Sequence, residues 1–313
     1  MKRLIILTVL FVCCWSTVVL ADCKASSGSA SLGSISSFSL ASTAQLVETG
    51  SGFICSGSLL SLLSTNTVTG NLRSSANGIG NTARLYNASS GNYVPYTICT
   101  DSACSNTMNI GSSKVWSSTT LLGLLGLFNA SDGSLPLYLK SEPGLNVAAG
   151  TYTDILTLNW NYSICFIGIA GLCVYTEGTA TSTIMVTLDV KNDCKIDSAP
   201  DLNFGSASLP GSFGKISDAI GIRCTLNASY SINLTSLNES SGNWRQMESA
   251  SGAHFLQYQL FRSDGTPWSV TNDLSNSGTG ELQRINYIAE VNPNQSNVPA
   301  GNYSDTVTVT VAY

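Results

Sequence analysis

The chain has 313 residues, of which 43% are hydrophobic and only 11% are charged, with a formal net charge of −5. Because no cluster of lysine and arginine is present to neutralise phosphates, the composition argues against a nucleic-acid partner. The hydrophobic fraction is too high for a disordered chain. After the N-terminal segment, no stretch reaches the ~20 consecutive apolar residues needed to span a bilayer.

The first twenty-one residues have the pattern of a secretory signal peptide. Two basic residues precede an apolar stretch from Leu4 to Leu20, and Ala21 ends a small-residue cleavage site. We therefore expect Sec export and a mature chain that begins at Asp22. The alternative is lipoprotein processing at Cys23, which is disfavoured because Asp22 stands where a small uncharged residue is needed.

The signal peptide contains two of the ten cysteines, which leaves eight, an even number in an exported chain. Such a count indicates disulfides formed in an oxidising compartment. Two cysteine pairs have nearly equal spacing, and each pair opens with the tripeptide Asp-Cys-Lys. This repetition favours pairing within each copy, although sequence alone leaves other connectivities open. The favoured set is Cys23–Cys55, Cys99–Cys104, Cys165–Cys173 and Cys194–Cys224.

Period-two alternation dominates the chain and predicts half-buried strands. One such run contains Ile184, Val186, Leu188 and Val190 in alternation with mostly polar residues, and the last run contains Val307, Val309, Val311 and Tyr313. Turn signals of the Asn-Gly and Asp-Gly type separate the runs, and long helical patterns are absent. The sequence therefore predicts an all-β protein with two immunoglobulin-like sandwiches in tandem.

One phrase occurs twice at a constant offset, at residues 146–162 (NVAAGTYTDILTLNWNY) and at residues 297–313 (NVPAGNYSDTVTVTVAY). The second copy ends the sequence, whereas the first is followed by another strand-like run, Thr181 to Val190. We expect the second sandwich to be incomplete, with an unpaired strand edge that another segment must cover. The expected organisation is a signal peptide at 1–21, an N-terminal domain at 22–178, a donor-like strand at 179–190 and a C-terminal domain at 191–313.

The segment from Gly301 to Val311, the aromatic residue at Tyr313 and the spacing of Cys194 and Cys224 together resemble the spore coat protein U domain. That domain is the pilin module of archaic chaperone–usher pili. The resemblance is good over residues 191–313 and partial over residues 22–162.

In that family, each subunit is an incomplete immunoglobulin-like sandwich, which a segment preceding the first cysteine of its neighbour completes by β-strand addition. The resemblance implies that Thr179 to Val190 completes the first domain within the chain and that the second domain accepts a donor strand from the next pilin subunit. Earlier partners would be a periplasmic pilus chaperone and the outer-membrane usher. Because Cys23 directly follows Asp22, no donor segment is expected at the mature N-terminus, which predicts an extracellular position at the pilus tip.

Two apolar segments of the first domain have no counterpart in the second. They are residues 120–128 (TLLGLLGLF) and residues 165–173 (CFIGIAGLC). Short apolar runs are commonly core strands, but the glycines and the predicted disulfide favour exposed hydrophobic loops. The residues predicted to bind an abiotic or host surface are Leu121, Leu122, Leu124, Leu125, Leu127, Phe128, Phe166, Ile167, Ile169 and Leu172. A weaker candidate is the segment from Tyr93 to Cys104.

The sequence offers little support for an enzyme. His254 is the only histidine, and the motifs of hydrolases, nucleotide-binding proteins and zinc proteins are missing. We expect no catalytic residues, no metal and no cofactor. The hypothesis is a tip adhesin that attaches cells to surfaces and supports biofilm formation, and the alternative is a minor structural pilin or spore-coat-like protein without a ligand of its own.

Overall fold

The computed structural model describes residues 22–56, 65–118, 126–169, 172–238, 240–269 and 272–313. By their contacts these residues divide into two compact units. Unit 1 comprises 22–33, 44–142 and 151–188, and unit 2 comprises 34–43, 143–150 and 189–313. Most of the donor-like strand expected at 179–190 groups with unit 1, the domain that it was expected to complete.

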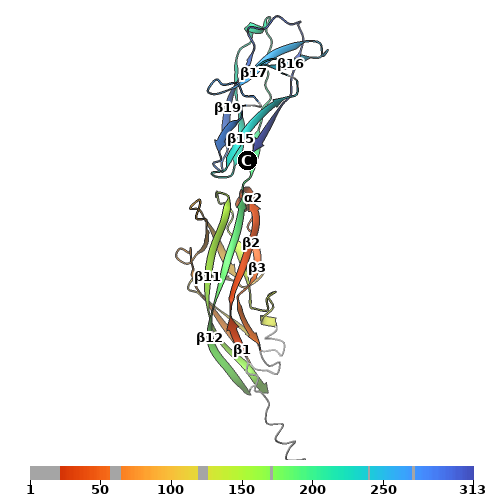
Figure 1. Cartoon of the computed structure of the whole chain (residues 1–313). Helices are drawn as coiled ribbons and strands as arrows, with labels where there is room; N and C mark the ends of the chain where they lie inside the picture. The colour runs from red at the N-terminus through yellow and green to blue at the C-terminus, as the bar shows by residue number, and fades with distance from the viewer. Residues whose placement is uncertain (1–21, 57–64, 119–125, 170–171, 239, 270–271) are drawn as a thin grey trace, which may run out of the picture. The chain divides into compact units, whose positions relative to one another are not determined.

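The described residues up to Lys191 form strands and the short helix α2 (Figure 1). In chain order these are β1 (Asp22–Ala25), β2 (Ser27–Ser36), α2 (Ser37–Ser42), β3 (Leu46–Gly50), β4 (Phe53–Ser56), β5 (Asn66–Ser75), β6 (Ala83–Tyr86), β7 (Tyr93–Cys99), β8 (Thr107–Met108), β9 (Ser113–Ser118), β10 (Pro136–Ser141), β11 (Gly150–Ile169) and β12 (Leu172–Lys191). The main sheet has the order β2-β12-β11-β6-β7-β10-β3, with β5 also paired to β11, and a separate small sheet pairs β1 with β4.

The core of unit 1 forms where inward-facing residues of separate strands meet. The Phe53 ring of β4 stacks on the Trp160 ring of β11, with centroids 5.0 Å apart and an interplanar angle of 13°. Leu72, Leu137 and Val186 from three other strands are also fully buried. Alternation of apolar and polar residues therefore has the expected effect, since one face of each strand turns to a shared core.

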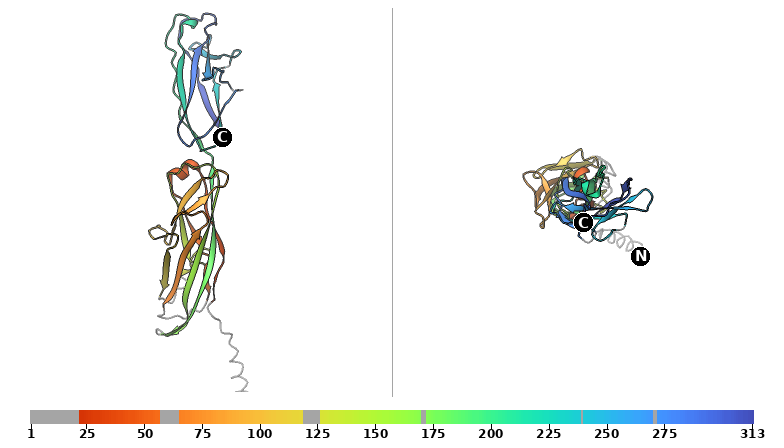
Figure 2. Two further views of the ribbon diagram at one scale, coloured as in Figure 1. Left: turned by 90° about the vertical axis from the view of Figure 1, so that its left-hand side faces the viewer. Right: turned by 90° about the horizontal axis from the view of Figure 1, so that it is seen from above.

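Strands β11 and β12 are adjacent in the sheet and run along the unit (Figure 1 and the left view of Figure 2). We expected the repeated strand to end near Tyr162 and a separate donor-like segment to begin at Thr179. Instead β11 continues to Ile169, and β12 begins at Leu172 and runs without interruption to Lys191. Ser163 donates a hydrogen bond to Glu177 at 3.0 Å, so the two strands remain in contact beyond the predicted ends. The strand that follows the first repeat is therefore the second arm of a long hairpin.

The described residues after Lys191 form the remaining strands and a short 3-10 helix, η1 (Pro210–Ser212), and by its contacts α2 also belongs to unit 2. The strands are β13 (Cys194–Ser198), β14 (Ile216–Cys224), β15 (Ser229–Ser236), β16 (Arg245–Ser249), β17 (Phe255–Arg262), β18 (Leu274–Ser277), β19 (Gln283–Val291), β20 (Tyr303–Ser304) and β21 (Val307–Ala312). They form one sheet of order β13-β14-β19-β17-β16-β20 and another of order β18-β15-β21. Ile222 and Leu260 from the first sheet share a core with Ile232 and Leu234 from the second. The expected all-β class with two sandwich units is confirmed.

Four disulfides join Cys23 to Cys55, Cys99 to Cys104, Cys165 to Cys173 and Cys194 to Cys224. The first and last lie at equivalent places, because Cys23 is opposite Cys55 in the β1–β4 pair and Cys194 is opposite Cys224 in the β13–β14 pair. Among the described residues, no helix has both the length and the apolar character that a membrane crossing requires. The predicted signal peptide lies outside the described residues.

Candidate functional site

The repeated phrase forms the same kind of strand in both units, but its burial differs. In β11 the inward-facing residues are fully buried, and they are Leu156, Leu158 and Trp160. In β21 the residues at the equivalent positions are only partly buried, and they are Val307, Val309 and Val311. Tyr313, which follows β21, is 58% exposed. The two copies therefore differ in how completely other residues cover their inward-facing side chains.

In unit 1 the cover is β12. Its predicted donor-like residues, Ile184, Val186, Leu188 and Val190, are at most 1% exposed. Ser182 is also buried; it accepts a hydrogen bond from the Trp160 indole at 2.8 Å and donates one to the backbone oxygen of Ser51 at 2.7 Å. Strand β12 therefore closes the core of unit 1 and satisfies the polar groups that lie there.

Strand β12 lies between β11 and β2 in the sheet. Thr183 donates a hydrogen bond to Ser27 at 3.0 Å, and Thr187 donates one to the backbone oxygen of Ala30 at 3.4 Å. Since the residue numbers rise together, β2 and β12 run in the same direction. Within unit 1, the N-terminal segment thus pairs first with β4 through β1 and then with β12 through β2.

In unit 2, β21 pairs with β15 along one edge. Among the strands of the described residues, none pairs with its other edge. A groove lies along β21, between the two sheets. Its apolar lining includes Ile220, Leu234, Leu260, Tyr287, Val307 and Val309. An unpaired edge beside an apolar groove is the arrangement that accepts an additional strand.

A buried cluster of hydrogen bonds around Asp154, here termed the polar corner, fixes the start of β11 in unit 1. Tyr96 donates a hydrogen bond to the Asp154 carboxylate at 2.7 Å, and the backbone N–H of Asn77 donates another at 3.0 Å. The Asn77 side chain donates to the backbone oxygen of Thr153 at 3.0 Å. Asp154 is 1% exposed. Burial, together with the charge of Asp154, raises the pKa of Tyr96 well above its usual range, so the phenol remains a donor.

Unit 2 repeats this corner at the start of β21. Tyr258 donates to Asp305 at 2.6 Å, the Asn238 backbone N–H donates to Asp305 at 3.2 Å, and the Asn238 side chain donates to the backbone oxygen of Ser304 at 3.3 Å. Burial, followed by the hydrogen bond to Asp305, raises the pKa of Tyr258. Unlike Asp154, Asp305 is partly exposed, because it lines the open groove.

Sequence reasoning missed this corner. Asp154 and Asp305 occupy the same position in the two copies of the repeated phrase. Their partners Tyr96 and Tyr258 come from β7 and β17, and the spacing between the two tyrosines differs from the spacing between the two aspartates.

The tip of the β11–β12 hairpin is the second candidate site. Leu172 is 82% exposed, Val174 is 67% exposed and Tyr175 is 43% exposed. The Cys165–Cys173 disulfide joins the two strands beside them. Phe166, Ile167 and Ile169 belong to β11, but their side chains lie outside the described part of the structure.

The other predicted apolar loop is placed only in part. Leu121, Leu122, Leu124 and Leu125 lie outside the described residues. Leu127 and Phe128 are described and are partly buried. Because the Phe128 ring lies 6.0 Å from the buried Phe53 ring, it packs at the margin of the core. Among the described side chains of the hairpin tip, Leu172, Val174 and Tyr175 are exposed and apolar, and the sequence pattern did not predict the latter two.

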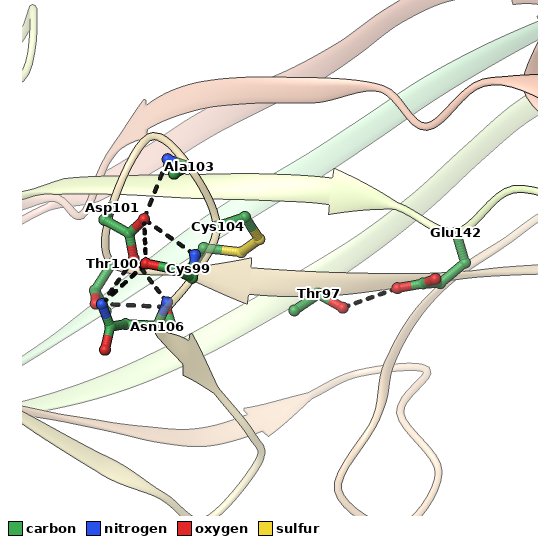
Figure 3. The surroundings of a disulfide bond; sticks show 9 residues. Thr97, Cys99, Thr100, Asp101, Ala103, Cys104, Asn106 and Glu142 are labelled. Atoms are coloured by element: carbon green, nitrogen blue, oxygen red, sulfur yellow. Dashed lines mark hydrogen bonds between the residues drawn. A yellow bond between two sulfur atoms is a disulfide. The ribbon is translucent and has the colours of Figure 1, made fainter.

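The Cys99–Cys104 loop, the weaker candidate, is closed by internal hydrogen bonds (Figure 3). The Asp101 carboxylate accepts bonds from the backbone N–H groups of Ala103 at 3.1 Å, Ser105 at 3.0 Å and Asn106 at 2.7 Å. Hydrogen bonds, the one from Ser105 first, lower the pKa of Asp101. The neighbouring Val94, Tyr96 and Ile98 are buried. The loop is therefore a turn at the end of β7 in which the Asp101 carboxylate finds its hydrogen-bond donors within the turn itself.

Among the described residues, no group of three or more histidine, cysteine, aspartate or glutamate side chains is arranged to hold a metal ion. His254 lies exposed on the turn before β17.

The chain therefore contains two tandem immunoglobulin-like sandwiches, one closed by its own strand β12 and one in which no strand of the described residues pairs with the outer edge of β21. The family model described as the Spore Coat Protein U domain matches residues 9–159 and 180–310. The chain belongs to this family, as its terminal motif and cysteine spacing predicted. No significant match was found among curated proteins.

Among solved structures, the chain is similar to the CsuC–CsuE chaperone–tip adhesion subunit pre-assembly complex from the archaic chaperone–usher Csu pili of Acinetobacter baumannii. That match has 26% identity and a TM-score of 0.60, and it covers 94% of this chain and 100% of the other. CfaE, the adhesive subunit of the CFA/I fimbria of enterotoxigenic Escherichia coli, matches with 12% identity and a TM-score of 0.36. That match covers 91% of this chain and 92% of CfaE. The CupB6 tip adhesin of Pseudomonas aeruginosa has 12% identity, a TM-score of 0.33 and coverage of 86% and 85%. The TM-scores of the last two likenesses lie below 0.5, so neither supports a statement about this chain.

Proposed function

We propose that this protein is the tip adhesin of an archaic chaperone–usher pilus, which attaches cells to surfaces and supports biofilm formation. Membership of the spore coat protein U family supports this proposal. So does the likeness to a chaperone–tip adhesion subunit complex, which extends over nearly the whole of both chains.

The single observation that carries the assembly role is the difference between β11 and β21. The same strand is sealed by β12 in unit 1 and is partly exposed along a groove in unit 2. Unit 2 would accept a strand from a periplasmic chaperone during export, and then the donor strand of the next pilin subunit at the outer-membrane usher.

The attachment role is assigned to the tip of the β11–β12 hairpin. Leu172, Val174 and Tyr175 place exposed apolar surface on a hairpin that a disulfide braces. Each large apolar side chain contributes ~1.5 to 3 kcal/mol when fully buried. Several such contacts repeated over many pili would hold a cell on an apolar abiotic or host surface.

Strand acceptance is tested by supplying the strand in cis. The full chain is extended after Tyr313 by a short linker with an Asn-Gly turn and a second copy of residues 179–191. The matched control has serine at the four inward positions of that copy. We expect the tethered strand to raise the unfolding midpoint of unit 2 by at least about 10 °C relative to the control. Equal midpoints would contradict the acceptor role.

Attachment is tested with the double variant Leu172→Ser/Val174→Ser. The matched control is Met185→Ser, a change on the same strand away from the tip, at a side chain that is 50% exposed. We expect piliated cells with the double variant to lose most of their attachment to polystyrene and their biofilm, while cells with the control keep both. Normal attachment and biofilm with normal numbers of pili would favour a minor structural pilin without a ligand.

A further inference from the structure

Residues 199–208 follow β13 and form no strand, although they occupy a place where unit 1 has one. Apart from the Gly205 N–H, which donates to the Asn203 side chain at 2.8 Å, their backbone makes no hydrogen bond with any described residue. In unit 1 the corresponding segment after β1 is β2, which pairs with β12. The segment in unit 2 is thus a strand-like stretch without a partner.

This segment has the alternation of a strand. Leu202 and Phe204 are partly buried against the core of unit 2, whereas Asp201, Asn203 and Gly205 are exposed. In β2 the corresponding inward residues, Ala30 and Leu32, are 6% and 5% exposed. Only side-chain packing therefore holds residues 199–208 in place, and that packing is less complete than in the paired strand of unit 1.

The two apolar side chains lie at the groove itself. The Phe204 ring is 6.1 Å from the Tyr258 ring and 6.5 Å from the Phe213 ring, in both cases edge to face. Two hollows meet here, one beside Val307 and Val309 and the other beside η1, and Leu202 and Phe204 line both of them. These two side chains therefore lie where the two hollows adjoin.

We propose that residues 199–208 act as a strap that partly covers the empty groove of unit 2 and becomes a paired β-strand when a donor strand enters. This inference rests on the proposed strand-acceptor function. In the free chain, Leu202 and Phe204 shield apolar surface that would otherwise promote aggregation. An incoming strand displaces the packing of Leu202 and Phe204 in the groove. Its backbone then forms hydrogen bonds with the backbone of residues 199–208, in the way that β12 pairs with β2 in unit 1.

Hydrogen exchange on the full chain, with and without the tethered strand, tests the strap. We expect the amides of residues 201–206 to exchange at least about tenfold more slowly when the groove is filled. Amides of β14, already paired on both sides, serve as the internal control.

Rapid exchange at 201–206 with new protection at β21 would overturn the strap and leave the acceptor function intact. Slow exchange at 201–206 in the free chain would also overturn the strap. Absence of new protection at β21 would overturn the acceptor function and the strap with it.

A second experiment uses the free chain alone. Leu202→Ser/Phe204→Ser should increase binding of a hydrophobic dye at least about twofold, because the strap then leaves more of the groove uncovered. The matched control is Leu237→Ser, at a side chain that is 77% exposed outside the groove. Dye binding equal to that of the control would show that these side chains cover nothing.

Discussion

The duplicated polar corner allows one substitution to be compared in two environments. Tyr96→Phe and Tyr258→Phe each remove a phenol that donates to an aspartate, at 2.7 Å and 2.6 Å respectively. The chemistry is the same, and the hydrogen-bond lengths are nearly equal. The environments differ, because Asp154 is buried beneath the closed sheet whereas Asp305 faces the open groove.

The magnitudes follow from this difference in exposure. Tyr96→Phe leaves a buried carboxylate short of one donor, and we expect it to lower the free energy of unfolding of unit 1 by about 2 to 3 kcal/mol. Tyr258→Phe should lower that of unit 2 by only about 0.5 to 1 kcal/mol, since water can replace the phenol at a partly exposed acceptor. With the tethered strand in the groove, the cost of Tyr258→Phe should rise towards that of Tyr96→Phe.

Native-state hydrogen exchange measures the two costs separately, from amides of β11 for unit 1 and of β15 for unit 2. Urea unfolding followed by tryptophan fluorescence provides the second measurement. Equal costs for the two substitutions in the free chain would refute the reasoning, and so would a cost of Tyr258→Phe that the tethered strand leaves unchanged.

Three further predictions concern stability. Val186→Ser puts a hydroxyl into the buried face of β12 and should cost unit 1 about 2 to 4 kcal/mol in urea unfolding, whereas Met185→Ser, at an exposed position on the same strand, should cost less than about 0.5 kcal/mol. Burial, and secondly the charge of Asp218, raises the pKa of Tyr287 to about 12. Between about pH 10 and 12 the unfolded state therefore loses a proton that the native state keeps, and the stability of unit 2 should fall, with a shallower fall in Tyr287→Phe. Cys165→Ser/Cys173→Ser should lower the stability of unit 1 by about 2.5 kcal/mol through loss of loop closure and should leave unit 2 unchanged by hydrogen exchange.

Each of these predictions has a contradicting result. Similar losses for Val186→Ser and Met185→Ser would show that β12 does not close the core of unit 1. If Tyr287→Phe leaves the pH dependence of the stability of unit 2 unaltered, Tyr287 does not contribute to the loss of stability at alkaline pH. Destabilisation of unit 2 by the cysteine variant would contradict the assignment of that disulfide to the hairpin of unit 1.

The strands of both units could be predicted because alternation of side chains is a local property. Ile184 to Val190 and Val307 to Val311 show it directly, and both stretches are strands with the expected inward faces. The strand-like run that follows the first copy of the repeated phrase was also predicted, and it is part of β12, whose inward residues are buried. The end of β11 was predicted wrongly at Tyr162, because the apolar run after Ser163 hides the alternation there.

Other features depend on contacts between distant segments. Tyr96 and Tyr258 belong to β7 and β17, far in the sequence from Asp154 and Asp305, so the repeated phrase gave no sign of either pair. Residues 199–208 show nothing unusual in composition, and their role is visible only by comparison with β2, which has a partner. Exposure of Val174 and Tyr175 likewise depends on how far the hairpin extends, which periodicity alone could not give.

The central claim is that the free edge of β21 receives a strand, and amide exchange along β21 tests it most directly. In the native chain, the amides of residues 307–312 that do not bond to β15 should exchange rapidly. With the tethered copy of residues 179–191, we predict that the same amides slow by at least about a hundredfold, while the serine control leaves them fast. Rapid exchange in both chains would contradict the claim that unit 2 is completed by a strand from elsewhere.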